Sequence, residues 1–171
     1  MRQSVTALHK GHGWMDRERA FDVRFSPDEP RVEMDPLVRL GNDRRDVLDR
    51  RLTFLASAGR IPRVCLYLIA ARGQQPVRSL AAAKDYVQKR GWQTRPDWLC
   101  IDRHGMTDPL LRAGWSVVRS HIRAGFVDGV VALTFSAISP HVDEYELQLM
   151  LVEQHGGFVG LVTPETAEGM R

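Results

Sequence analysis

The sequence predicts an α/β fold with an open, mostly parallel sheet and helices on both faces. Residues 64–69 form an unbroken apolar run, which is typical of a strand buried on both faces of a parallel sheet. Later in the chain, short apolar runs alternate with amphipathic stretches of helical period, as they do in βαβ units. The 171 residues are 43% hydrophobic, so we expect one domain with a substantial core and an extension before it.

The extension comes first along the chain. Residues 1–42 are polar, contain several prolines and show no sustained period, so an extended or poorly ordered arm is expected. Asn42-Asp43 offers a helix N-cap, and an amphipathic helix is predicted over residues 43–59. Its apolar stripe consists of Val47, Leu48, Leu52 and Leu55. Its arginines, expected to stay in solvent, are Arg44, Arg45, Arg50 and Arg51.

Residues 60–171 are predicted to form the α/β domain. Its elements are a strand over 64–69, a helix over 79–90, a strand over 98–101, a helix from the Asp108-Pro109 cap to 124, a strand over 127–135, a helix after Ser139-Pro140 and a strand over 158–163. The predicted strand over 64–69 is apolar throughout, and the predicted strand over 127–135 has an apolar centre from Val130 to Leu133. We therefore predict that these two strands are adjacent and central in one parallel sheet.

Two short motifs point to a known family. Residues 63–68 read Arg-Val-Cys-Leu-Tyr-Leu and continue into Ile69, Ala70 and Ala71, while residues 136–140 read Ser-Ala-Ile-Ser-Pro. Together with a Gln-containing loop at 73–75, a Ser-Leu helix start at 79–80 and a Gly-Trp pair at 91–92, they occur in an order that resembles the catalytic domain of serine site-specific recombinases, the resolvase/invertase family. The resemblance covers residues 61–166.

This resemblance implies a site that has lost its chemistry. Family members attack a DNA phosphodiester with a serine hydroxyl and hold the phosphate with several arginines. The serine position is Ala71 here, and Ile69, Asp108, Ala137 and Pro140 stand where the resemblance implies arginines. The matching positions, which we call the vestigial site, are Tyr67, Ile69, Ala71, Asp102, Asp108, Ser136, Ala137 and Pro140. We therefore expect no DNA cleavage and no cofactor.

Other groupings of polar residues predict less. Arg72, Asp102 and His104 follow the first two strands, at the end where open parallel sheets bind ligands, so a small-ligand pocket is an alternative there. Ser139, His141 and Asp143 are spaced like helix-capping residues rather than a triad. His9 and His12 are too few for a metal site, and none is predicted. Cys65 and Cys100 are expected to be reduced core thiols of a cytoplasmic protein.

The charge balance argues against strong nucleic-acid binding. The formal net charge is +3, although the pI is about 9.2, and no basic tract is present. No apolar run is long enough to span a membrane, so no membrane association is expected.

The resemblance leads us to expect an interaction or regulatory module linked to DNA recombination in a bacterial-type system. Its expected partners are DNA, bound weakly, a recombinase or other protein, or a second copy of the chain in a homodimer. The alternative functions are a working DNA-binding subunit of a recombination complex and a small-ligand binder.

The resemblance also bears on the helix over 43–59. In the family, a long helix after the catalytic domain forms the dimer. We expect the helix over 43–59 to dock onto an apolar surface of this chain or of a dimer mate, and to cover the surface on which the family's dimer helix would otherwise lie.

Overall fold

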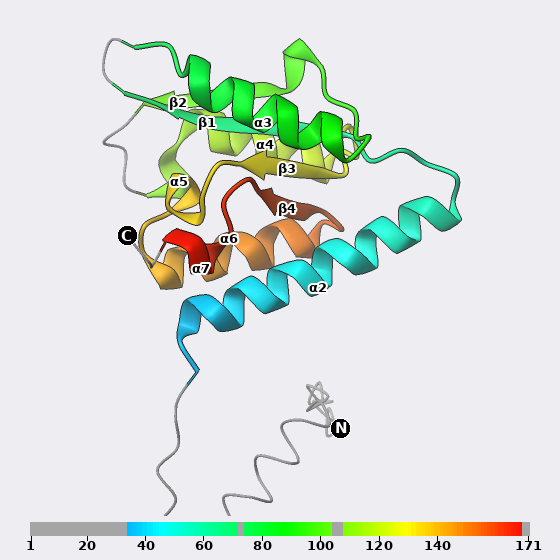
Figure 1. Cartoon of the computed structure of the whole chain (residues 1–171), viewed down its shortest axis with the longest axis horizontal. Coiled ribbons are helices and arrows are strands. Elements are labelled where there is room, and N and C mark those ends of the chain that lie inside the picture. The colour runs from blue at the N-terminus through cyan, green and yellow to red at the C-terminus, as the bar shows by residue number, and fades with distance from the viewer. Residues whose placement is uncertain (1–33, 72–73, 104–107, 169–171) are drawn as a thin grey trace, which may run out of the picture. The chain divides into compact units, whose positions relative to one another are not determined.

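Four parallel strands form the centre of the fold (Figure 1). The computed structural model describes residues 34–71, 74–103 and 108–168. Predictions about the arm before residue 34, Arg72 and His104 lie outside the described residues. Within the described residues, no helix is long and apolar enough to cross a membrane.

The strands are β1 (Val64–Ala70), β2 (Leu99–Arg103), β3 (Gly129–Ala132) and β4 (Phe158–Leu161), and their order in the sheet is β2-β1-β3-β4. All neighbouring strands are parallel, with Cys65 opposite Val130 and Val131 opposite Gly160. The prediction that the first and third strands are adjacent and central is confirmed. Every residue of β3 and β4 is buried, as the apolar runs predicted.

Helices cover both faces of this sheet. Side chains of α4 (Ala113–Arg123) and α6 (Val142–Gln154) pack against one face in a cluster that contains Tyr67 and Trp115. On the other face, α3 (Val77–Lys89) packs Ala83 and Val87 against Leu66. The predicted α/β architecture with helices on both faces is therefore confirmed.

The helix before the sheet is longer than the sequence suggested. α2 spans Pro36–Ser57, so it begins before the expected start at Asp43. The Asp35 carboxylate accepts a hydrogen bond from the Leu37 amide at 2.8 Å, and Pro36 occupies the first helical position, where its missing N–H costs nothing. The same Asp-Pro signal had been used in the sequence only at Asp108.

α2 docks onto this chain and covers the edge strand β4. Leu40 joins the cluster on the α4/α6 face, whereas Leu48 and Leu55 join the cluster on the α3 face. The helix thus crosses the sheet edge, and Figure 1 shows it running beside β4 and α6. The Arg44 guanidinium donates to the Val159 carbonyl at 3.3 Å, so a side chain of α2 bonds to the main chain of the edge strand.

Several boundaries differ from the prediction. The apolar stretch over 127–135 contains only the short strand β3, and its last residue begins a helical turn, α5 (Phe135–Ile138). The helix expected from Asp108 is split into a 3₁₀ turn (Pro109–Leu111) and α4. α3 starts at Val77 with no side-chain cap, so Ser79 is not its N-cap. α6 is followed by β4 and by α7 (Glu165–Glu168).

Candidate functional site

A buried polar network lies at the carboxyl ends of β1 and β2. It joins Tyr67 of β1, Asp102 of β2 and Arg112, which immediately precedes α4. The three residues are 0%, 5% and 4% exposed. Burial of a polar group costs free energy unless the group is hydrogen-bonded. The hydrogen-bond partners of each of the three residues therefore indicate its role in the fold.

Asp102 caps α4. One carboxylate oxygen accepts from the Gly114 amide at 2.7 Å, and the other accepts from the Trp115 amide at 2.9 Å and from the Tyr67 hydroxyl at 3.0 Å. A carboxylate at a helix N-terminus satisfies amides that have no partner within the helix, and it interacts favourably with the helix dipole. Residue 114 has to be small, since a Cβ there would lie 2.9 Å from the carboxylate.

Arg112 is the cation that joins this network, and the sequence analysis did not single it out. Its Nη1 donates to the carbonyls of Ala137 and Ile138 at 2.9 and 2.8 Å, and it lies 3.3 Å from the Tyr67 hydroxyl. The guanidinium therefore ties the start of α4 to α5. Only its position, directly before the apolar stripe of α4, could have indicated it, because no motif marks an arginine that bonds to main-chain oxygens.

Tyr67 remains a neutral phenol in these surroundings. Burial raises its pKa; the hydrogen bond from Arg112 lowers it, and the charge of Asp102 raises it again. The net effect is a raised pKa. The hydroxyl therefore keeps its proton and donates a hydrogen bond to the Asp102 carboxylate. A buried, protonated phenol is a poor nucleophile.

The remaining vestigial-site residues carry no cluster of charge. Ala71 is exposed just after β1, Ile69 is half-buried against the α4/α6-side core, and Pro140 is exposed. Asp108 accepts from the Leu110 amide at 2.8 Å and so caps the 3₁₀ turn. This confirms its predicted capping role, whereas its match to a family arginine stays a prediction.

The hydroxyls at this end of the sheet are engaged in local bonds. Ser136 and Thr134 oxygens lie 2.9 Å apart. Ser139 is fully buried, donates to Glu144 at 2.6 Å and accepts from the His141 amide at 3.1 Å. His141 thus contributes its main chain to Ser139 and is itself the N-cap of α6, which has no side-chain cap. Residues 139–143 therefore lead into a helix, but the expected cap at Ser139 is wrong, because α6 begins only at Val142. Cys65 and Cys100 are buried and free, as expected.

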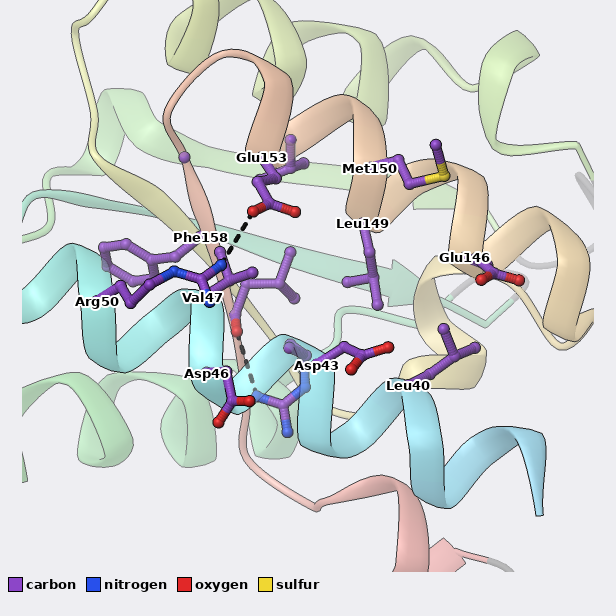
Figure 2. Close-up of a pocket in the computed structure, with 14 residues that line it drawn as sticks. Leu40, Asp43, Asp46, Val47, Arg50, Glu146, Leu149, Met150, Glu153 and Phe158 are labelled. Atoms are coloured by element: carbon purple, nitrogen blue, oxygen red, sulfur yellow. Dashed lines mark hydrogen bonds and ion pairs between the residues drawn. The ribbon is translucent and has the colours of Figure 1, made fainter. Parts of the chain in front are cut away.

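The described residues also form a cleft away from the carboxyl ends of the strands, beside the start of β4. It has a volume of about 270 Å³ and lies between α2 and α6. Figure 2 shows Leu149 and Glu153 of α6 facing Val47 and Arg50 of α2. The Arg50–Glu153 ion pair, at 3.1 Å, bridges the two helices. Apolar side chains and a charged rim make this cleft an imperfectly filled helix–helix contact rather than a catalytic pocket.

No metal-binding group of three or more His, Cys, Asp or Glu side chains occurs within the described ranges. Asp102, one of the three residues of the predicted ligand pocket, has its carboxylate occupied by the cap of α4 and by Tyr67. Among the described residues, this end of the sheet therefore offers an internally hydrogen-bonded network, and Ala71 follows β1 at the same end.

Comparison with known proteins agrees with this architecture. No protein-family profile matches the chain, and no curated protein is detectably similar to it in sequence. Among solved structures, it is similar to the C-terminal catalytic domain of ISC1926 TnpA, an IS607-like serine recombinase, with a TM-score of 0.52, 17% identity and coverage of 63% of this chain and 77% of that one.

A second solved structure gives the same result. The N-terminal catalytic domain of TP901-1 integrase aligns with a TM-score of 0.50 and 18% identity over 58% of this chain and 76% of that chain. The described part of this chain therefore has the fold of the serine recombinase catalytic domain.

Proposed function

We propose that this chain is a non-cleaving serine recombinase-like domain that acts as an interaction or regulatory module in DNA recombination. The observation that carries the proposal is Ala71, an exposed methyl group at the position that the resemblance assigns to the nucleophilic serine. A methyl group cannot attack a phosphodiester. The link to recombination rests on the fold, which the chain has in common with catalytic domains of proteins named as a serine recombinase and an integrase.

The hydroxyls and the buried arginine described at the carboxyl end of the sheet support the loss of cleavage. The Tyr67 hydroxyl is buried and protonated, and the Ser139 hydroxyl is buried and bonded to Glu144. Arg112 is bound to two main-chain carbonyls, so it would have to leave them to hold a phosphate. Removal of a single transition-state donor commonly costs a factor of about 10²–10³ in rate. Loss of the nucleophile, together with the engagement of Arg112 by main-chain carbonyls, should leave no measurable cleavage.

A cleavage assay tests this proposal. The full chain is incubated with supercoiled DNA and with nicked duplexes that trap a covalent intermediate, and a covalent protein–DNA adduct is sought on denaturing gels. We expect none. A reproducible adduct through any Ser, Thr or Tyr of the wild-type chain would refute the non-cleaving proposal.

The variant Ala71→Ser tests the loss of the nucleophile separately from the loss of the arginines that would hold the phosphate. It restores a hydroxyl at the nucleophile position without adding an arginine. We expect no adduct from this variant either, because Arg112 is held by Ala137 and Ile138 and the attacked phosphate would remain without charge neutralisation. Adduct formation by Ala71→Ser would show that the rest of the site is still competent.

A DNA-binding subunit of a recombination complex remains the second candidate, because the fold is that of proteins that process DNA. DNA affinity measured as a function of salt distinguishes it from the first. An interaction module should bind duplex DNA weakly, with a dissociation constant above about 10⁻⁶ M at physiological salt and no preferred sequence. Sequence-specific binding tighter than about 10⁻⁸ M would favour the second candidate.

A further inference from the structure

A groove between the outer sides of α4 and α6 is lined by cationic and hydroxyl side chains. Its volume is about 190 Å³. The residues that line it are Ser116, Arg119, Ser120, Arg123, Leu151 and His155. None of them is acidic, so the groove concentrates positive charge in a chain whose formal net charge is only +3.

The spacing of the α4 residues places them on one side of that helix. Positions 116, 119, 120 and 123 are related by three and four residues, which puts their side chains in one stripe along a helix. Two guanidinium groups and two hydroxyls therefore line the same wall. His155 comes from the residue that follows α6 and lines the groove from the neighbouring helix.

These groups lack partners among the described residues. The buried Nε of Arg119 has no hydrogen-bond acceptor, and no ion pair or side-chain hydrogen bond joins either arginine to another described residue. On α2, by contrast, the hydroxyls of Thr53 and Ser57 turn back to main-chain carbonyls at 2.9 and 2.7 Å. The α4 hydroxyls make no such bond within the described part of the chain.

Carboxylates of α6 do not neutralise the groove. Glu153 bonds to Arg50 of α2, and Glu144 accepts from Ser139. Cations near helix C-termini are often explained by the helix dipole, which accounts for Arg123 at the last residue of α4. It does not account for Arg119, which lies a full turn before the end of α4, and whose buried Nε would cost free energy without an acceptor.

We propose that this groove binds a phosphate group. Arginine forks match phosphate oxygens in geometry and charge, and hydroxyls supply further donors to the same anion. The phosphate belongs either to a nucleic-acid backbone or to a free phosphorylated compound, since both present the same oxyanion. The proposal does not depend on the proposed function, because it involves neither Ala71 nor cleavage.

The first experiment titrates the full ¹⁵N-labelled chain with sodium phosphate at constant ionic strength and follows amide shifts by NMR. Saturable shifts should be confined to α4 and to the end of α6, and sodium chloride should not produce them. Arg119→Gln should weaken phosphate binding about tenfold or more, which corresponds to ~1.4 kcal/mol. Arg78→Gln is the matched control: it removes the same charge from α3, on the opposite face of the sheet, and should leave the affinity unchanged.

Folding of each variant is checked by its thermal transition. If Arg119→Gln does not fold, Arg123→Gln and Ser120→Ala test the same groove from more exposed positions and should each weaken binding. The proposal is overturned if phosphate gives no saturable shifts at the groove. It is equally overturned if the folded groove variants bind phosphate as well as Arg78→Gln does.

A second arm identifies the source of the phosphate. A 20-base-pair duplex is added to the phosphate-saturated chain. If the duplex displaces phosphate, and if the Arg119→Gln variant binds the duplex more weakly than the wild type does, the site takes a backbone phosphate. If the duplex leaves the phosphate shifts in place, the site takes a free phosphorylated compound. Either result requires that the groove itself binds the anion, and so supports the proposal.

Discussion

Arg44 and Glu165 form a buried ion pair that fastens α2 to the C-terminal part of the fold, and its disruption is the most informative stability test. The Arg44 guanidinium donates to both carboxylate oxygens, at 2.6 and 2.9 Å, and to the Val159 carbonyl. The Tyr145 hydroxyl donates to the same carboxylate at 2.8 Å. The two charged side chains are 5% and 0% exposed. Arg44→Met removes the cation and leaves the carboxylate in place.

The expected cost follows from this burial. Removal of one partner of a buried pair costs about 3–5 kcal/mol, because the other charge stays buried without compensation. Domains are stable by only about 5–15 kcal/mol. For a chain of this size, the loss corresponds to a fall in Tm of about 6–20 °C. Thermal and urea unfolding followed by circular dichroism would measure it. Arg45→Met, at an exposed position on the same helix, is the matched control and should change stability by less than about 0.5 kcal/mol.

The pH dependence gives a second, independent signature. Burial alone would raise the pKa of Glu165, but the hydrogen bonds and charge of Arg44 overcome it, and the pKa is lowered from 4.5. A lowered folded-state pKa contributes stability that is present above pH 4.5 and is lost as the pH falls through the lowered value. In Arg44→Met the carboxyl should instead be protonated on folding. The difference in unfolding free energy between wild type and variant should therefore begin to narrow above pH 4.5, where the variant's carboxyl takes up its proton, and should narrow further as the pH falls through the lowered pKa of Glu165 in the wild type.

The double variant Arg44→Met/Glu165→Met decides between this explanation and simple loss of packing. Apolar replacement of both partners often restores stability, so the double variant should be more stable than Arg44→Met alone. The reasoning would be refuted if Arg44→Met cost less than about 1 kcal/mol, or if the second substitution destabilised the protein further.

Three further predictions concern the sheet and its cover. Leu66→Asp places an unpaired carboxylate in the middle of β1, where Leu66 is 2% exposed, and should cost several kcal/mol; a soluble variant with a cooperative melt near the wild-type Tm would contradict the buried strand. Gly114→Ala pushes a methyl group against the Asp102 carboxylate and should cost about 1–3 kcal/mol in urea unfolding; an unchanged midpoint would mean that the helix cap tolerates displacement. A chain beginning at Arg60 lacks three buried leucines of α2. Their burial contributes about 5–9 kcal/mol before conformational entropy is subtracted, so the shortened chain should have a lower Tm or aggregate. An unchanged Tm and oligomeric state would mean that α2 is a passive linker.

The sequence predicted the sheet well because burial on both faces leaves an unambiguous pattern. β1 contains no charged residue, and only a strand with cover on both sides tolerates such a run. The same criterion predicted too long a strand for β3. The apolar residues continue to Phe135, where the chain has already left the strand and begins the helical turn α5. Apolar periodicity cannot distinguish these two states over so few residues.

Polar contacts between residues far apart in the chain could not be predicted from the sequence. Arg44 was expected in solvent, yet it is buried, because Glu165 and the Val159 carbonyl supply acceptors at the position where its helix crosses β4. Arg112 was overlooked for the same reason, since its acceptors belong to α5. In both cases the burial of an arginine depends on groups that only the fold brings to it, and no local spacing encodes that.

The contact between α2 and the end of the chain has a consequence for biosynthesis. Arg44 and Glu165 are 121 residues apart, and ribosomes add about 5–20 residues per second. Arg44 is therefore added to the chain about 6–24 s before its partner carboxylate. During that interval Leu48 and Leu55 have no β4 to cover, which leaves the nascent helix open to chaperones or to the wrong apolar surface. Closure of the domain therefore waits until β4 and α7 have been made, and a ribosome stalled before residue 158 would hold a chain in which α2 has no β4 to cover.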